Sequence, residues 1–277
     1  MIGAAKRAAA SMALVWGQGA GAAPLDIVFF AEGATERNAA ALDQAEAFWE
    51  RIVTGYQDGA DIGGPLEIDV FVVDEDGPGG TLATGGWDDA VVTEAGFILP
   101  VLGSIRFDSA DLPMPNTPDE QLAFETLLHE VGHALGFGTL WDANGLRDGD
   151  AYIGTAGVEA YVAEFGLRSA DGIPLATGEG EGEGGDDADG DYGHWDEDWP
   201  GGPAEMMTPF QEGTASLSAT TIASFRDLGY TTVEPAARGS LPVFSAPAPA
   251  PIPLPATAWL LGGALIGTFV WRRRPAD

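Results

Sequence analysis

The chain has 277 residues, 45% of them hydrophobic, with 8 Trp and 13 Phe, and this apolar content excludes a generally disordered protein. The region 23–244 holds 42 acidic residues against 7 basic ones, which argues against nucleic acid or anionic lipid as a partner of that region. The chain has no cysteine, so disulfides and a cysteine-based latency switch are excluded. We interpret the acidity as a solvated surface, with specific cation binding as the alternative.

The first 22 residues have the features of a secretory signal. Lys6 and Arg7 precede an apolar stretch over 8–16, and small residues at 20–22 suit a cleavage site. An ordinary first helix is the alternative, because the apolar stretch is short. We therefore expect an exported protein whose mature chain begins near Ala23.

The region 23–244 is predicted to be one domain. A buried strand is predicted over 25–31, and a helix over 39–55 with Ala47, Phe48, Ile52 and Val53 on one side. The alternating segment 66–73 predicts a half-buried strand, 77–86 a turn, and 91–99 and 102–107 two more strands. This order of elements indicates an α+β fold with a mixed, twisted sheet and helices packed on it.

A helix is predicted from 117 to about 136. Thr117 can cap it, Pro118 suits its first turn, and Glu120 stands where a capping box places a glutamate. Within this helix, His129 and His133 are four residues apart and share one face, so both imidazoles can bind one zinc ion. Glu130 lies beside them and can take a proton from water without being a ligand, which is the chemistry of the HExxH motif.

A catalytic zinc site requires a third protein ligand and an open fourth position. His194 is the sole remaining histidine of the chain, so it is the candidate third ligand. A surface histidine in an acidic loop would be the alternative if the HExxH motif were absent.

The strings HEVGHALGFGTLW, HWDE and EMMTP resemble the leishmanolysin-like metzincins, over about residues 25–233. The resemblance implies a metzincin-like zincin fold, with an N-terminal subdomain to about 136 and a mostly irregular or helical C-terminal subdomain after it. It makes Gly136 the glycine that ends the helix, and it brings in His194 across a long insertion instead of Thr139. It also makes Met207 the methionine of the turn beneath the metal, with Met206 as the alternative, and it implies that substrate lies extended along the strand 91–99.

The stretch 178–193 is acidic and of low complexity. Asp186, Asp187, Asp189 and Asp191 are oxygen ligands of the type that calcium prefers, but the spacing lacks the glutamate of an EF-hand loop. We interpret this stretch as a solvated loop, with a Ca²⁺ site as an alternative that the spacing does not support.

The C-terminal end combines a Pro/Ala linker over 245–255 with an apolar segment over 256–271 and three arginines at 272–274. This order resembles PEP-CTERM bacterial sorting signals, in particular the variant with the motif VPLPA. The apolar segment and the arginines predict that 256–277 is a membrane anchor, and the resemblance implies that a membrane enzyme cuts this tail after export. A plain single-pass anchor is the alternative.

Together these features predict an exported zinc endopeptidase that acts on proteins or peptides at the cell envelope, the outer surface or outside the cell. The rival interpretation is a surface-tethered acidic binding or matrix protein with a structural or vestigial zinc site. A structural site would be closed by a fourth protein ligand, for which Asp196 and Glu197 are the candidates.

Overall fold

The computed structural model describes residues 23–112, 119–177, 192–210, 215–234 and 241–242. The predicted signal segment, the linker, the anchor and the four aspartates of the acidic stretch lie outside these residues, as do Thr117 and Pro118. All described residues belong to one compact unit of the chain.

The main sheet has four strands in the order β1-β3-β5-β4. Their bounds are β1 Ile27–Phe30, β3 Leu66–Val73, β4 Ala83–Val92 and β5 Ile98–Asp108. Strands β1, β3 and β5 run parallel to one another, and β4 pairs with β5 in the antiparallel direction as an edge strand. The predicted mixed sheet is therefore confirmed, and the predicted strand 66–73 coincides with β3.

The β4–β5 hairpin corrects two predictions. The predicted strand 91–99 is wrong because it contains the hairpin turn, where the amide of Thr93 donates to the carbonyl of Phe97 over 2.8 Å. Gly96 makes this turn with φ of +92°, a conformation that favours glycine. The predicted turn over 77–86 is wrong at its end, because Gly85 and Gly86 belong to β4. Apolar periodicity alone does not reveal a turn inside a β-prone run.

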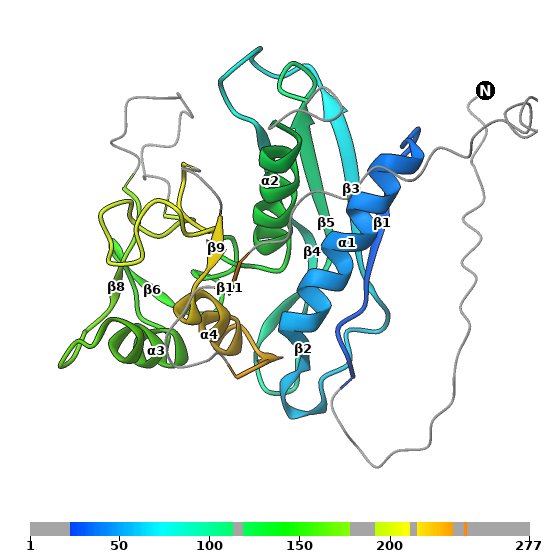
Figure 1. The fold of residues 1–277 in the computed structure, drawn as a ribbon. Coiled ribbons are helices and arrows are strands. Elements are labelled where there is room, and N and C mark those ends of the chain that lie inside the picture. The colour runs from blue at the N-terminus through cyan, green and yellow to red at the C-terminus, as the bar shows by residue number, and fades with distance from the viewer. Residues whose placement is uncertain (1–22, 113–118, 178–191, 211–214, 235–240, 243–277) are drawn as a thin grey trace, which may run out of the picture. The chain divides into compact units, whose positions relative to one another are not determined.

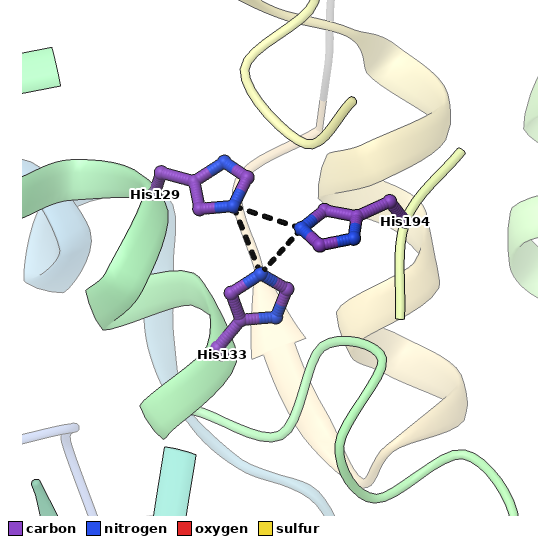
Figure 2. A group of neighbouring side chains, drawn as sticks. All are labelled: His129, His133 and His194. Carbon is purple, nitrogen blue, oxygen red and sulfur yellow. Dashed lines mark hydrogen bonds between the residues drawn. The ribbon is translucent and has the colours of Figure 1, made fainter. Parts of the chain in front are cut away.

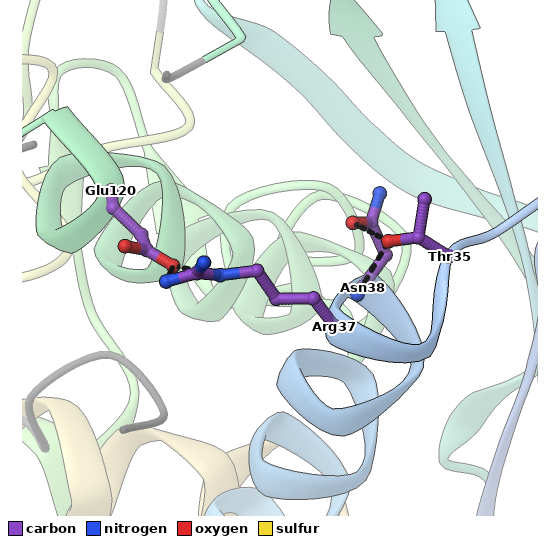
Figure 3. A network of polar contacts seen from close by, with 4 residues as sticks. All are labelled: Thr35, Arg37, Asn38 and Glu120. Carbon is purple, nitrogen blue, oxygen red and sulfur yellow. Dashed lines mark hydrogen bonds and ion pairs between the residues drawn. The ribbon is translucent and has the colours of Figure 1, made fainter. Parts of the chain in front are cut away.

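Two long helices, α1 (Glu36–Ile52) and α2 (Asp119–Ala134), contact each other and the main sheet, and in Figure 1 they lie in front of its strands. Helix α1 begins after Thr35, whose side chain accepts a hydrogen bond from the amide of Asn38. Figure 3 shows this cap and the ion pair that joins Arg37 of α1 to Glu120 in the first turn of α2. The starts of the two helices are thus tied together.

The predicted helix 39–55 begins and ends three residues later than the observed helix α1. Helix α1 ends at Ile52, and Val53 begins the short strand β2 (Val53–Tyr56). Ala47 is exposed, contrary to expectation, and Trp49 is fully buried, with its indole nitrogen donating to the carbonyl of Leu128 in α2 over 3.0 Å. The buried face of α1 therefore includes the large side chain of Trp49 and excludes the small side chain of Ala47.

The described residues after α2 form two further helices and several short strands. The helices are α3 (Thr155–Phe165) and α4 (Ala219–Asp227). A three-stranded sheet consists of β6 (Arg147–Asp148), β7 (Ala151–Tyr152) and β8 (Ile173–Pro174). Strand β9 (Ser216–Leu217) pairs with β11 (Leu241–Pro242), and β10 (Tyr230–Thr232) pairs with β2. The α+β class is confirmed by this combination of sheets and helices.

Helices α3 and α4 cap each other. Asp227, at the end of α4, accepts hydrogen bonds from the amides of Ala156 and Gly157 in the first turn of α3. Glu164, near the end of α3, accepts from the amides of Ala219 and Thr220 in the first turn of α4. Each carboxylate satisfies amides that the helix itself leaves free, and lies where the helix dipole favours negative charge.

Candidate metal centre

Helix α2 brings the first two imidazoles together. His129 and His133 are separated by about one helical turn and are 8% and 6% exposed, and their Nε2 atoms are 2.9 Å apart. Both rings point from α2 toward His194 (Figure 2).

His194 reaches the same point from a loop 61 residues further along the chain. Its Nε2 atom lies 3.0 Å from Nε2 of His129 and 3.0 Å from Nε2 of His133, so the three nitrogens form a triangle (Figure 2). Backbone hydrogen bonds hold this loop on both sides. The carbonyl of His194 accepts from the amide of Ala176, and the amide of Trp195 donates to the carbonyl of Met207 over 3.0 Å.

The other ring nitrogen of each helical histidine is directed at a backbone carbonyl. Nδ1 of His129 lies 2.6 Å from the carbonyl oxygen of Met206, and Nδ1 of His133 lies 2.9 Å from that of Phe137. A carbonyl oxygen can only accept, so both Nδ1 atoms carry the proton. In the neutral rings, each Nε2 atom then presents a lone pair to the centre of the triangle, and this is the arrangement in which histidine binds metal.

The donor set fits zinc. Bare nitrogen lone pairs 2.9 Å apart repel each other, and a shared cation between them removes that repulsion. Nitrogens that bind one zinc at 2.0–2.1 Å in tetrahedral geometry lie about 3.3 Å apart, close to the spacing of these three. Neutral imidazoles without a thiolate suit zinc and other divalent transition metals.

No carboxylate joins this group within the described residues. The ligand atoms that lie within 4.8 Å of one another here belong to the three histidines alone. Asp196 accepts a hydrogen bond from the amide of Asp198, and Glu197 accepts one from the amide of Phe210. The two carboxylates that could have closed the site are therefore directed to the backbone of their own region.

Glu130 is a buried residue of α2 on the side that faces the edge strand β4. It is 5% exposed, and a Cβ atom added to Gly85 of β4 would stand 2.8 Å from its Cβ, its carbonyl oxygen and its Oε2. Gly85 therefore allows β4 to lie directly against the residue that the HExxH motif designates as the base. The sequence prediction missed this role, because it assigned Gly85 to a turn.

The segment after α2 turns on two glycines. Gly136 has φ of +102°, and its amide donates to the carbonyl of His133, so it ends α2 where the resemblance implied. Gly138 has φ of +72°, and a Cβ there would stand 2.2 Å from the carbonyl oxygen of Gly193. Gly138 thus makes room for the residue that precedes His194. The sequence carried a signal for this in the repeated glycine of GFG, which the prediction did not use.

Thr139 does not belong to the group of three histidines. Its hydroxyl donates to the carbonyl of His133 over 2.7 Å, and its own carbonyl accepts from the indole nitrogen of Trp87 in β4. Thr139 therefore caps the end of α2 and links it to the edge strand.

Both methionines of EMMTP are fully buried at the site. Met206 provides the carbonyl for His129. Met207 packs its sulfur against Gly132, between the two histidines of α2, where an added Cβ would stand 2.9 Å from Sδ. The two methionines that the sequence offered as alternatives thus both contact the site, Met206 through its backbone carbonyl and Met207 through its side chain.

Apart from the three histidines, a group of acidic side chains lies near the ends of β3 and β5 and consists of Asp76, Asp108 and Asp111, of which Asp108 is the last residue of β5. Asp108 is 1% exposed and accepts hydrogen bonds from the amides of Ala110, Gly77 and Asp76. The bond from Ala110, followed by the other amides, lowers the pKa of Asp108 below its usual value, against the effect of burial. The carboxylate thus ties the β3–β4 connection to the chain after β5.

Comparison with known proteins identifies the C-terminal end. The model of the PEP-CTERM protein-sorting motif matches residues 251–274. The chain carries a PEP-CTERM sorting signal. This signal indicates export and sorting to the cell envelope or surface, and it implies that a processing enzyme acts on the C-terminal tail. A comparison with curated proteins finds no match.

The membrane-anchor prediction concerns 256–277, which the structure does not describe. Among the residues that it does describe, no helix is long and apolar enough to cross a membrane.

Proposed function

We propose that this chain is an exported zinc-dependent endopeptidase with a metzincin-like fold of the leishmanolysin type. The observation that carries the proposal is the convergence of three imidazole Nε2 atoms, without a fourth protein ligand among the described residues, two of these atoms belonging to a helix that also carries the buried Glu130 directly after His129. Catalytic zinc sites have three protein ligands and an open position, whereas structural sites have four.

The residues divide the work between binding and proton transfer. His129, His133 and His194 hold the metal through Nε2, and the carbonyls of Met206 and Phe137 keep two of the rings in the required tautomer. Zinc, when bound, supplies a Lewis acid that acidifies water and polarises the carbonyl of the scissile peptide bond. Glu130 accepts the proton of the attacking water on its carboxylate and delivers it to the nitrogen of the leaving amine.

The edge strand is the proposed site for the substrate backbone. Strand β4 pairs with β5 on one side and ends the sheet on the other, so its outer edge offers amide and carbonyl groups to an extended peptide. The resemblance assigns this role to 91–99, whereas the edge strand of the structure is Ala83–Val92. Because Gly85 of β4 lies against Glu130, a peptide bound along this edge would pass close to the proton acceptor.

The rival interpretation is a binding or matrix protein with a structural zinc site, and the described residues offer no fourth ligand for such a site. Closure of the site by Asp196 or by Glu197 would require that residue to give up the backbone hydrogen bond that it accepts. The open position therefore favours catalysis.

The test is digestion of casein or gelatin by the purified exported protein, before and after removal of metal with a chelator. We expect hydrolysis that the chelator abolishes and that zinc restores. A protein that binds one zinc ion tightly and cleaves neither substrate, nor a diverse peptide library, would support the rival interpretation instead.

A further inference from the structure

Glu205 is a buried carboxylate that the proposed chemistry leaves without a role. It is 2% exposed, and no described Lys, Arg or His forms an ion pair with it. Its Oε2 accepts from the amide of Met207 over 2.7 Å, and its Oε1 accepts from the amide of Ser218 over 3.0 Å and from the hydroxyl of Thr221 over 2.7 Å. Burial raises the pKa of Glu205, and these hydrogen bonds oppose that rise. A buried carboxylate of this kind is costly unless every acceptor is used.

One branch of this network leads to His129. The amide of Met207 is held by Glu205, and the carbonyl of the preceding residue, Met206, accepts the proton on Nδ1 of His129. The carboxylate thus fixes the turn that determines the tautomer and orientation of one imidazole.

A second branch leads to His194. The hydroxyl of Thr221 donates to Glu205 and accepts from the indole nitrogen of Trp195 over 2.8 Å. The amide of Trp195 donates to the carbonyl of Met207. The amide of Met207 in turn donates to Glu205. The side chain and the backbone amide of Trp195 are therefore both held in place. Trp195 is fully buried and directly follows His194, so these bonds fix the chain next to the third imidazole.

We propose that Glu205 is a positioning residue of the three-histidine site, which holds the Met206 carbonyl against His129 and, through Thr221 and Trp195, the loop that carries His194. The inference rests on the proposed function only in that it takes the three imidazoles as the zinc ligands. Two of the three ligands are then set by one carboxylate that lies outside the HExxH motif and does not touch the metal.

Glutamine cannot replace this carboxylate. Both oxygens of Glu205 accept from backbone amides, and the amide group of glutamine would turn a donor toward one of them. Glu205→Gln therefore breaks at least one branch at nearly constant volume.

Glu164 provides the matched control. It also caps the first turn of α4, through the amides of Ala219 and Thr220 and the hydroxyl of Thr220, but none of these bonds leads to a histidine. Loss of either carboxylate weakens the start of α4, and only the loss of Glu205 also releases the site.

The experiment compares the exported wild-type protein with Glu205→Gln and Glu164→Gln. Zinc affinity is measured by competition with a chromophoric chelator, the melting temperature is measured on the metal-free proteins, and the visible absorption spectrum is recorded after substitution with cobalt(II). We expect both variants to melt earlier. We expect only Glu205→Gln to bind zinc about 10- to 100-fold more weakly and to show a changed cobalt spectrum.

A second pair of variants keeps the test decisive if Glu205→Gln fails to fold. Thr221→Val removes the hydroxyl that joins Glu205 to Trp195, and Thr221→Ser retains it. Weaker zinc binding in the valine variant, with recovery in the serine variant, supports the network.

Two results overturn the inference alone: wild-type zinc affinity and cobalt spectrum in Glu205→Gln, or an equal loss of affinity in Glu164→Gln. A wild-type protein that binds no zinc would overturn the proposed function and this inference with it.

Discussion

Nδ1 of His129 donates to the carbonyl oxygen of Met206 over 2.6 Å, across 77 residues of sequence. This bond fixes the tautomer of the ring, whose Nε2 faces the other two imidazoles, so the turn before Met207 determines which nitrogen of the first histidine of the motif is presented to them. We therefore expect substitutions at this site to have three distinct effects, according to whether the residue binds metal, transfers protons, or allows two segments to pack closely.

Glu130→Gln should retain zinc and lose hydrolysis. The amide keeps the size of the side chain but cannot accept a proton, so we expect the turnover rate to fall by about 10²- to 10⁴-fold at unchanged metal content. Metal analysis beside a casein assay measures both quantities. The same substitution at Glu159, on the exposed side of α3, is the control and should change neither. An active Glu130→Gln protein would contradict the assignment of the base.

His194→Ala and Thr139→Ala should have opposite effects on metal. Without His194 only two ligands remain, both on one helix, so zinc and activity should be lost together. Thr139→Ala should keep zinc and lower the free energy of unfolding by about 1 kcal/mol, because it removes the hydroxyl that caps the carbonyl of His133. Metal analysis and urea unfolding distinguish the two. Full zinc content in His194→Ala would exclude the distal ligand.

Gly138→Ala should weaken zinc binding although it lies outside the ligand set. Its Cβ would collide with the carbonyl oxygen of Gly193 and displace His194. Gly145→Ala is the matched control, since Gly145 has a similar φ of +68° but nothing within 4 Å of an added Cβ. Both variants should lose about 1–2 kcal/mol of stability from the left-handed backbone conformation, and only Gly138→Ala should lose zinc affinity. Equal affinities in a chelator competition would contradict the role of Gly138.

Two adjacent glycines of β4 should differ in their tolerance of alanine. A Cβ at Gly85 would press on Glu130, whereas one at Gly86 would meet Cγ2 of Thr139 at an ordinary distance of 3.8 Å. We expect Gly85→Ala to lower both the melting temperature and the turnover rate without loss of zinc, because it separates the edge strand from α2. Gly86→Ala should melt close to the wild type. Wild-type stability in Gly85→Ala would show that β4 does not lie against Glu130.

Asp108 should make stability depend on pH in the acid range. The pKa of its carboxyl group is lowered in the folded protein, so its contribution is complete above the unfolded value of about 4 and is lost as pH falls through the lower folded value. In urea unfolding between pH 2 and 6, the stability difference between wild type and Asp108→Asn should therefore be largest at the upper end and shrink toward the lower end. A difference that does not change with pH would contradict this.

The local features of this protein follow from its sequence because they depend on near neighbours. Spacing by four residues places His129 and His133 on one face of α2, alternation defines β3 as 66–73, and the order of elements indicates a mixed sheet. The sorting signal at 251–274 is likewise a linear pattern.

Only the tertiary structure decided which distant segments meet. Sequence offered His194 by elimination, but its place beside His129 and His133 depends on Gly138 and on the backbone bonds to Ala176 and Met207. Gly85 was predicted in a turn because a glycine in the sequence can mark either a turn or a point where another segment packs closely against the backbone. The side chain that packs there belongs to Glu130, which is 45 residues away in the chain. Glu205 carried no local signal, since a buried carboxylate is recognised only from the donors that the fold gathers around it.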